Sequence, residues 1–233
     1  MSKKSELHRG APAQPTRLRR SPAAMSELKA RMLARAREIH RDEGLEALSM
    51  RRLAEEFGLS TMAMYSYFRD KQALLSGLWV EAFEALVERL QAAAQPSATP
   101  LQRLDVHLRC LIAFWEERVD QYRLVYLSAA QTAGASDLVD LGRQPAYAQL
   151  LLLTRERVAA CLQGQATGEP EESLLRMQTD LLVAQLLGYL QLTLGVARYP
   201  LLDREALREL LIQEILRSVG GAAQTPRRGA AQA

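Results

Sequence analysis

The stretch from Ser49 to Leu75, SMRRLAEEFGLSTMAMYSYFRDKQALL, decides how this chain folds. Ser49 can cap a short helix with one apolar face, and Gly58 can stop it. The tight turn Gly58-Leu59-Ser60 follows, and its last residue can cap another helix that begins at Thr61. Two helices joined by such a turn form the helix-turn-helix arrangement.

The start of the second helix carries side chains that can reach base pairs. A helix that reads DNA presents small or polar side chains at its first turn and keeps its other face in a core. Thr61 can hydrogen-bond a base edge, while Met62 and Ala63 can contact thymine methyl groups. Met64 and Phe68 lie four residues apart, so we expect both to face the core.

The residues that follow can hold the DNA backbone. Tyr65, Ser66 and Tyr67 can direct hydroxyl groups at phosphates. Asp70 can cap a long fourth helix, and Lys71 adds its charge to the backbone N–H groups at the start of that helix. Both features attract a phosphate oxygen.

Positive charge is concentrated toward the N-terminus. Residues 1–24 carry six Lys and Arg against one acid, residues 25–71 carry nine against eight, and residues 72–233 carry fifteen against eighteen. This asymmetry indicates a polyanion partner for the first part and a different role for the rest.

The quoted stretch strongly resembles the DNA-binding region of the TetR family of bacterial transcription regulators. The resemblance covers about residues 26–90, and the remainder only as a general all-helical plan. The residues that carry it are Leu53-Ala54, Gly58-Leu59-Ser60, Tyr65-Ser66-Tyr67-Phe68, Asp70-Lys71 and Leu74-Leu75.

The resemblance implies a three-helix DNA-binding domain, a linking fourth helix, and a larger helical domain that dimerises and binds a small effector. It implies that the base readers are Thr61, Met62 and Ala63. It also implies that the DNA backbone is held by Ser49, Tyr65, Tyr67 and Lys71. Met62 and Met64 are more apolar than the residues many members carry nearby, so the resemblance leaves the operator sequence open.

Length and composition agree with an all-α chain of one or two domains. The 233 residues are 48% hydrophobic and 24% charged, and aromatic residues make up only 6%, which favours helices over sheets. We expect a disordered basic arm at 1–24, the helix-turn-helix domain at 25–71, an effector-binding and dimerisation domain at 72–219 that opens with a linking helix at 72–95, and a disordered tail at 220–233.

Apolar periodicity and capping residues predict the individual helices. We expect caps at Ser26, Ser49, Ser60, Asp70 and Asp203. The predicted helices span about residues 27–43, 50–57, 61–68, 71–95, 101–118, 121–131, 146–163, 171–199 and 203–219. Residues 132–145 are ambiguous, and residues 164–170 read as a loop.

The chain shows no sign of secretion or membrane insertion. Cys110 and Cys161 cannot form a disulfide framework, and no signal-like stretch opens the chain. The longest run without charge, residues 181–197, is short and polar for a membrane span. We therefore expect a cytoplasmic protein without a membrane partner.

An enzymatic interpretation has little support. None of the three histidines sits in a metal-binding or nucleophile motif. His107 and Cys110 are neighbours on one helix and could supply two metal ligands or an activated thiol, but two ligands do not complete a zinc site. Cys110 and Cys161 could act as a redox sensor, although free cysteines are commonly small buried apolar residues. We expect no catalytic residue, metal or cofactor; a helical enzyme using His107 or Cys110 remains the alternative.

Several polar and aromatic residues of the second domain could line an effector cavity, because ligand pockets are mostly apolar with a few placed polar groups. The alternative is that the polar ones face a partner helix or water. The candidates are His107, Trp115, Tyr122, Tyr126, Gln178, Gln185 and Tyr189. Their scarcity of charge favours a neutral or weakly polar organic effector.

Two C-terminal helices could form a homodimer interface as a four-helix arrangement. Gly188 and Gly195 lie seven residues apart on one face, where missing side chains allow close approach. The other candidates, on the last helix, are Leu207, Leu211 and Ile215. The apolar stripe predicted for that helix consists of Leu207, Leu210, Leu211, Ile215 and Val219.

Taken together, the residues and the resemblance predict a homodimeric regulator that binds a palindromic operator in double-stranded DNA and leaves it on binding a small organic effector. An activator, or a DNA binder that needs no ligand, would have the same fold. The basic arm could be a solvated tail or an extension that touches DNA.

Overall fold

The computed structural model describes residues 21–94, 98–128, 144–163, 171–195, 200–201 and 203–222. These residues form helices and contain no strand, which confirms the all-α prediction for the described part of the chain. The α-helices are α1 (Pro22–Glu43), α2 (Met50–Glu56), α3 (Thr61–Met64), α4 (Lys71–Ala92), α5 (Pro100–Glu117), α6 (Val119–Arg123), α9 (Pro145–Gln163), α10 (Glu172–Leu190) and α11 (Arg204–Ala222). A 3-10 turn η1 (Leu45–Ala47) and two π-helical turns, η2 (Leu124–Ser128) and η3 (Gln191–Gly195), complete the described elements.

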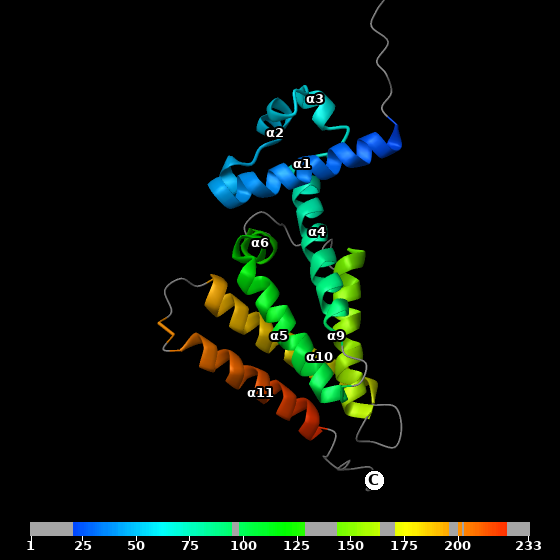
Figure 1. The fold of residues 1–233 in the computed structure, drawn as a ribbon, viewed down its shortest axis with the longest axis vertical. Helices are drawn as coiled ribbons and strands as arrows, with labels where there is room; N and C mark the ends of the chain where they lie inside the picture. Colours follow the sequence, from blue (N-terminus) through cyan, green and yellow to red (C-terminus); the bar gives the residue numbers. More distant parts are fainter. Residues whose placement is uncertain are drawn as a thin grey trace, which may run out of the picture.

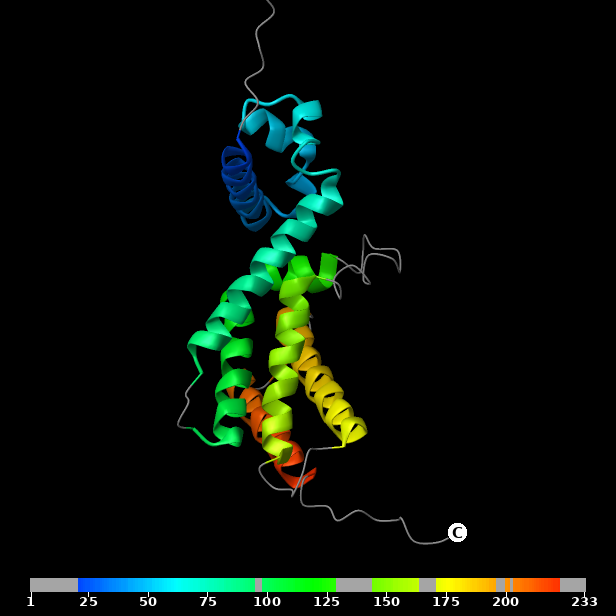
Figure 2. The same ribbon diagram turned by 90° about the vertical axis from the view of Figure 1, so that its right-hand side faces the viewer.

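The helices are arranged as a small head and a larger body (Figure 1). The head consists of α1, α2 and α3, and α4 runs from the head into the body. The body contains α5, α6, α9, α10 and α11, and the view turned by 90° shows α4, α5, α9, α10 and α11 running along its length (Figure 2). Within it, α4 packs against α5 and α9, while α9 also packs against α10.

Four predicted caps are confirmed by hydrogen bonds. The side chains of Ser49, Ser60, Asp70 and Asp203 each accept from the backbone N–H three residues further on, at 3.2, 3.1, 2.7 and 2.9 Å. Such bonds satisfy N–H groups that a helix start leaves without a partner. Gly44 and Gly58 have φ of 87° and 62°, a backbone conformation that favours glycine and ends α1 and α2 as predicted.

The first helix begins earlier than predicted. Ser21 is its cap and accepts from the N–H of Ala24 at 3.3 Å, and Pro22 occupies the first helical position. The cap predicted at Ser26 was wrong, as was the boundary of the arm at residue 24. A serine followed by a proline is itself a helix-start signal that outweighs the basic composition around it.

The last helix differs from the prediction in its end and in its apolar face. It continues to Ala222, beyond the end predicted at Val219, so the tail boundary at 220 was wrong. Its end packs on α5, because a Cβ at Gly220 would lie 3.7 Å from Leu101. Leu210, predicted on the apolar stripe, is 58% exposed, and Ile212 is buried in its place.

Other predicted boundaries shift by smaller amounts. The α-helix predicted at 61–68 covers one turn, Thr61–Met64, and α4 ends at Ala92. The helix predicted at 121–131 begins at Val119 and passes into a π-helical turn at residue 124. The α-helix predicted at 171–199 ends at Leu190 and continues as η3. The predictions for residues 95–97, 129–143, 164–170 and 196–199 lie outside the described residues, as do those for 1–20 and 223–233.

Buried side chains run continuously from the head into the body. Met32, Leu53 and Phe68 belong to the head, and Phe83 and Trp115 belong to the body. No helix in the described part of the chain is long and apolar enough to cross a membrane.

Candidate functional site

Helix α3 presents its first turn to solvent and is anchored from behind. Met64 and Phe68 are buried, which confirms the prediction that both face the core. Thr61 is exposed, Met62 is 80% exposed, and Ala63 is half-buried. An exposed methionine can contact an apolar group of a partner, and the thymine methyl group is such a group.

The tyrosines after α3 occupy different environments. Tyr65 is about half exposed, whereas Tyr67 is partly buried against the core. The hydroxyl of Ser66 donates to the carbonyl oxygen of Ala63 at 2.6 Å. The Ser66 hydroxyl was predicted to point at a phosphate, but its hydrogen already forms a hydrogen bond within the turn.

Lys71 lies at the start of α4, next to the η1 turn. Its Nζ donates to the carbonyl oxygen of Leu45 at 3.3 Å, and the side chain is otherwise exposed. Asp70 caps the same helix, and the Ala73 N–H together with Arg69 holds the pKa of its carboxyl below the usual range. The carboxylate already satisfies one N–H at this helix start, so Lys71 is the main attraction for a phosphate there.

Two arginines of α2 are paired with acids inside the head. Arg52 bonds to Glu43 at 2.8 Å, and Arg51 bonds to Glu55 at 2.8 Å. Ser49, at the cap of α2, is exposed. The positive charge of α2 is therefore partly neutralised within the head, whereas Lys71 bonds to an uncharged carbonyl oxygen.

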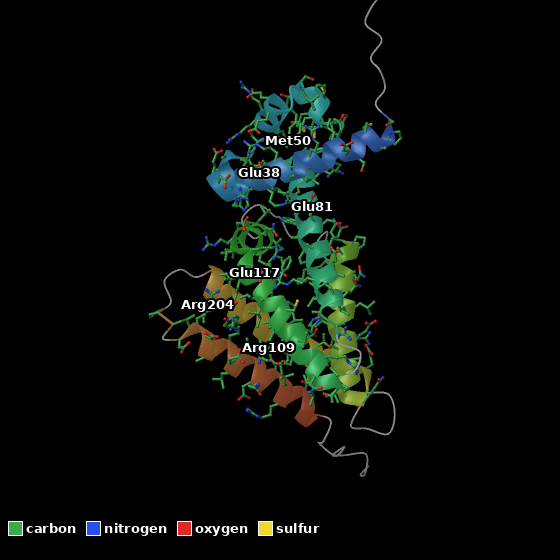
Figure 3. The ribbon with its side chains drawn as sticks, in the orientation of Figure 1. Glu38, Met50, Glu81, Arg109, Glu117 and Arg204 are labelled. Atoms are coloured by element: carbon green, nitrogen blue, oxygen red, sulfur yellow. The ribbon has the colours of Figure 1, made fainter. Side chains whose placement is uncertain are left out.

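The head and the body are joined through α4 and α6. Arg37 of α1 forms an ion pair with Glu81 of α4, which lies where the head meets the body (Figure 3). A Cβ at Gly77 would lie 2.8 Å from the Leu33 side chain, so this glycine lets α1 cross α4 closely. The Nε2–H of His40 donates to the carbonyl oxygen of Asp120 in α6 at 3.2 Å.

A small cavity lies in the body between α5, α9 and α10. It measures about 40 Å³. Its walls are formed by aliphatic and aromatic side chains. Among the non-aromatic lining residues, only Thr154 carries a hydroxyl group. The lining residues are Leu111, Trp115, Tyr126, Tyr147, Leu150, Leu151, Thr154, Val183, Leu186, Leu187 and Leu190.

The structure brings four of the seven candidate effector residues to this cavity or its immediate surroundings. Trp115 and Tyr126 line it. Tyr122 packs on both, with ring centroids 5.8 Å from Trp115 and 4.9 Å from Tyr126. His107 lies one layer behind, with its Nε2 3.1 Å from the Thr154 hydroxyl.

The other three candidates lie elsewhere. The hydroxyl of Tyr189 donates to Glu116 at 3.1 Å, and this carboxylate also pairs with Arg204 and Arg208. These ion pairs join α5 to α11, and Figure 3 labels Arg204 at the start of α11. Gln178 lies beside Ser218 of α11, and Gln185 does not line the cavity.

Tyr147 and Thr154 line the cavity but were missed by sequence reasoning. Both lie on α9, whose apolar residues are spread over all its faces, so no periodic pattern marks the side that faces α5 and α10. The contact of Thr154 with His107 joins residues 47 positions apart. Only tertiary packing could have shown it.

The cysteines and histidines of the described residues do not assemble a metal centre. No group of three or more metal-ligating side chains occurs there. Burial raises the pKa of the Cys161 thiol to about 11, and burial also raises that of Cys110. Burial lowers the pKa of His107 to about 4, so its ring is neutral at physiological pH. High thiol pKa values disfavour the thiolate that redox chemistry needs.

The candidate dimer residues divide into exposed and buried groups. Gly188 is exposed, and a Cβ built there would meet nothing within 4 Å. Ile215 is buried inside the protomer, and Leu207 and Leu211 pack partly against the same core. A Cβ at Gly195 would meet the Gln191 side chain at 2.8 Å. Of the five, Gly188 is therefore the most available to a second copy.

Helix α10 exposes apolar residues in a stripe that includes Gly188. Met177 is 66% exposed, and Leu181 and Ala184 are also exposed. The spacing of these residues, at three or four positions, places them on one helix face. Leu210 adds an exposed apolar side chain on the neighbouring α11.

The described residues place a helix-turn-helix at one end of an all-helical arrangement, which is an architecture of DNA-binding proteins. Residues 32–78 match the family model described as bacterial regulatory proteins, tetR family. Over these residues the chain is similar to the DNA-binding region of that family. No curated protein sequence matches it significantly.

Solved structures share the fold over most of the chain. A protein of unknown function from Rhodococcus sp. RHA1 is 23% identical, with 88% of this chain and 98% of that one covered and a TM-score of 0.62. The TetR family transcriptional regulator PfmR from Thermus thermophilus is 18% identical, with 80% and 97% covered and a TM-score of 0.56. RolR, solved in complex with its ligand resorcinol, is 19% identical, with 91% and 100% covered and a TM-score of 0.59.

Proposed function

We propose that this protein is a cytoplasmic, homodimeric repressor that binds a palindromic operator and leaves it when a small organic effector binds in the body. The observation that carries the proposal is the exposed first turn of α3, fixed from behind by Met64 and Phe68. A rigid anchor with small and apolar side chains facing outward suits the major groove. The cavity of the body would hold the effector.

On the DNA side, we assign base reading to Thr61, Met62 and Ala63. Tyr65, Lys71 and Ser49, which caps α2, would hold phosphates. Ser66 and Tyr67 have weaker support, because one hydroxyl is engaged in the turn and the other side chain is partly buried.

On the dimer side, we assign the interface to the exposed stripe of α10 around Gly188. One recognition helix sees too few base pairs for useful specificity, and a two-fold dimer doubles the site. The exposure of Met177, Leu181 and Leu210 supports this assignment, since a second copy would cover them.

Two connections can carry an effector signal to the head. Helix α4 begins at Lys71 and packs against α5 and α9, which line the cavity. Tyr122 and Tyr126 follow Asp120 in the chain, whose carbonyl oxygen accepts from His40 of α1. An effector that favours another position of α4 or α6 would change the separation of the two recognition helices. A tenfold loss of operator affinity needs about 1.4 kcal/mol of coupling.

The decisive experiment is selection of an operator from random duplexes by the purified full chain. The proposal expects an inverted repeat bound with strong salt dependence. Compounds that lower operator affinity would then identify a released repressor. Enrichment of no sequence would contradict the proposal and favour a helical protein of another class.

Replacing Lys71 with alanine should weaken binding to every duplex. Because Lys71 would contact a phosphate, its loss should flatten the slope of log affinity against log salt by about one unit for each protomer. Titration of a selected operator at several salt concentrations measures the slope. Arg155→Ala removes an arginine from the body and should leave it unchanged; an unchanged slope in Lys71→Ala would contradict the phosphate contact.

Replacing Thr61 with alanine should instead change sequence preference. Loss of a base-edge hydrogen bond should reduce discrimination at one base pair of each half-site by roughly 1–3 kcal/mol. Titrations of operators substituted at single positions show which pair is affected. A uniform loss across all positions would show that Thr61 does not read a base.

A further inference from the structure

The cavity of the body has a chemistry that narrows the class of effector. Resting on the proposed function, we infer that the effector is an uncharged compound with a single ring and one hydrogen-bond donor, held among the aromatic side chains with its donor at Thr154. Four features of the described residues support this inference. They are the aromatic wall of the cavity, the hydroxyl of Thr154, the absence of charged lining residues, and the volume of the cavity.

Aromatic side chains form one wall of the cavity. Trp115 and Tyr126 meet edge to face, with ring centroids 5.7 Å apart. Phe83 stands behind the wall, with its centroid 6.0 Å from Trp115 and 5.0 Å from Tyr147, both edge to face. Rings held in this way offer edges and faces to another ring, an arrangement favourable for aromatic contact. Leucines and Val183 form the remaining wall.

Thr154 gives the cavity a directional polar group. Its hydroxyl donates to the carbonyl oxygen of Leu150 at 2.9 Å, so its hydrogen is used. The Nε2–H of His107 must then donate to the Thr154 oxygen, 3.1 Å away. A hydroxyl oxygen has two lone pairs, so one remains for a further donor. A ligand hydroxyl or N–H can supply it, whereas an acceptor alone cannot.

The cavity carries no charge to pair with an ionised ligand. None of its lining residues is acidic or basic. Burial raises the pKa of the lining Tyr126 and Tyr147, so both hydroxyls are neutral. His107, one layer behind, is neutral because burial lowers its pKa to about 4. A carboxylate or ammonium group would lose its hydration here without a partner, which is strongly unfavourable.

The volume limits the size of the ligand. One water needs about 10–15 Å³ of free cavity and takes up about 30 Å³ in the liquid, so the cavity of about 40 Å³ corresponds to about three waters, or roughly 90 Å³ of ligand. A six-membered ring with one small substituent fills that space.

The larger hollow of the head does not share these properties. It measures about 800 Å³, is open to solvent, and is lined by α1 and α2. Its walls carry Glu27, Arg31 and the ion pair between Arg35 and Glu56. A neutral ring in this open, charged hollow would bury little apolar surface, so it would gain little from binding there.

The test uses the purified full chain and three probes: phenol, toluene and benzoate. Phenol has a ring and a donor, toluene lacks the donor, and benzoate is charged. Tryptophan fluorescence and thermal melting measure binding of each probe at neutral pH. We expect phenol to bind severalfold more tightly than toluene and benzoate not to bind. Benzoate that binds as tightly as phenol, or three probes that fail to bind up to their solubility limits, would overturn the inference.

Thr154→Val locates the donor contact. Valine keeps the shape but removes the oxygen, so the phenol affinity should fall on the order of fivefold while the toluene affinity stays the same. Thr179→Val is the matched control, because Thr179 makes the same type of bond, to the Leu175 carbonyl oxygen at 2.7 Å, and does not line the cavity. An unchanged ratio of phenol to toluene affinity in Thr154→Val would overturn the assignment of the donor.

Operator affinity separates this inference from the proposed function. If phenol binds with the expected preferences but leaves operator affinity unchanged, the ligand class is supported and effector release is contradicted. If benzoate releases the operator and phenol does not, release is supported and the ligand class is overturned.

Discussion

Gly188→Leu is expected to leave each protomer folded and to lower operator affinity on the order of 100-fold or more, because two linked half-site contacts bind roughly 10²–10⁴ times more tightly than one. The position is exposed on α10, and a Cβ there meets nothing within the protomer. Leucine is also a better helix former than glycine. The added side chain would therefore act on the partner copy, where the two helices would otherwise approach closely.

Light scattering, thermal melting and operator titration together test this expectation. Ala85→Leu is the control, since Ala85 is exposed on α4, a different helix from the one that carries the stripe. The control should keep the dimer mass and the operator affinity of the wild type. A Gly188→Leu protein with dimer mass and wild-type operator affinity would show that the dimer forms through another surface.

The helix-turn-helix could be predicted from sequence because its determinants are local. Ser49, Ser60 and Asp70 each bond to an N–H three residues away, and Gly58 adopts its own positive φ. The spacing of Met64 and Phe68 likewise indicates the buried side of one turn. None of these features depends on a distant part of the chain, so they can be read without the structure.

The cavity could be predicted only in part, because distant segments build it. Trp115 and Tyr126 lie near one another in sequence, and both were identified as candidates. Thr154 becomes visible only when α9 packs against α5 and brings it to His107. The position of Tyr189 also depends on distant packing: its hydroxyl donates to Glu116 at the junction with α11, and the residue does not line the cavity.

The faces of α11 show the same limit. Leu210 and Ile212 both belong to a stretch of consecutive apolar residues in α11. The sequence pattern alone therefore allows either side chain to face the core. Packing against α5 and α9 selects Ile212 and leaves Leu210 exposed. The local pattern therefore predicts that a helix is amphipathic but not which edge of its stripe meets the neighbours.

His107→Gln is expected to reduce the acid sensitivity of the fold. The folded-state pKa of His107, about 4, is lowered by burial and then by Arg157, against an ordinary value of 6.5. Because its folded pKa is depressed, the unfolded chain binds more protons between these values, and the free energy of unfolding falls as the pH falls. Above pH 6.5 the ring is neutral in both states, so His107 does not affect the free energy of unfolding. That free energy decreases progressively between pH 6.5 and about 4.

The size of the effect follows from the width of that window. At about 1.4 kcal/mol per pH unit, the wild type should lose on the order of 3 kcal/mol more than the variant. Glutamine can still donate to Thr154 but does not titrate, and other acids of the chain titrate equally in both proteins. Urea unfolding at about pH 7, 5.5 and 4.5 measures the difference, with Thr179→Val as a control for the loss of a partly buried polar group. Parallel curves for wild type and His107→Gln would show that His107 is protonated without cost, so that the ring is not held neutral beside Thr154.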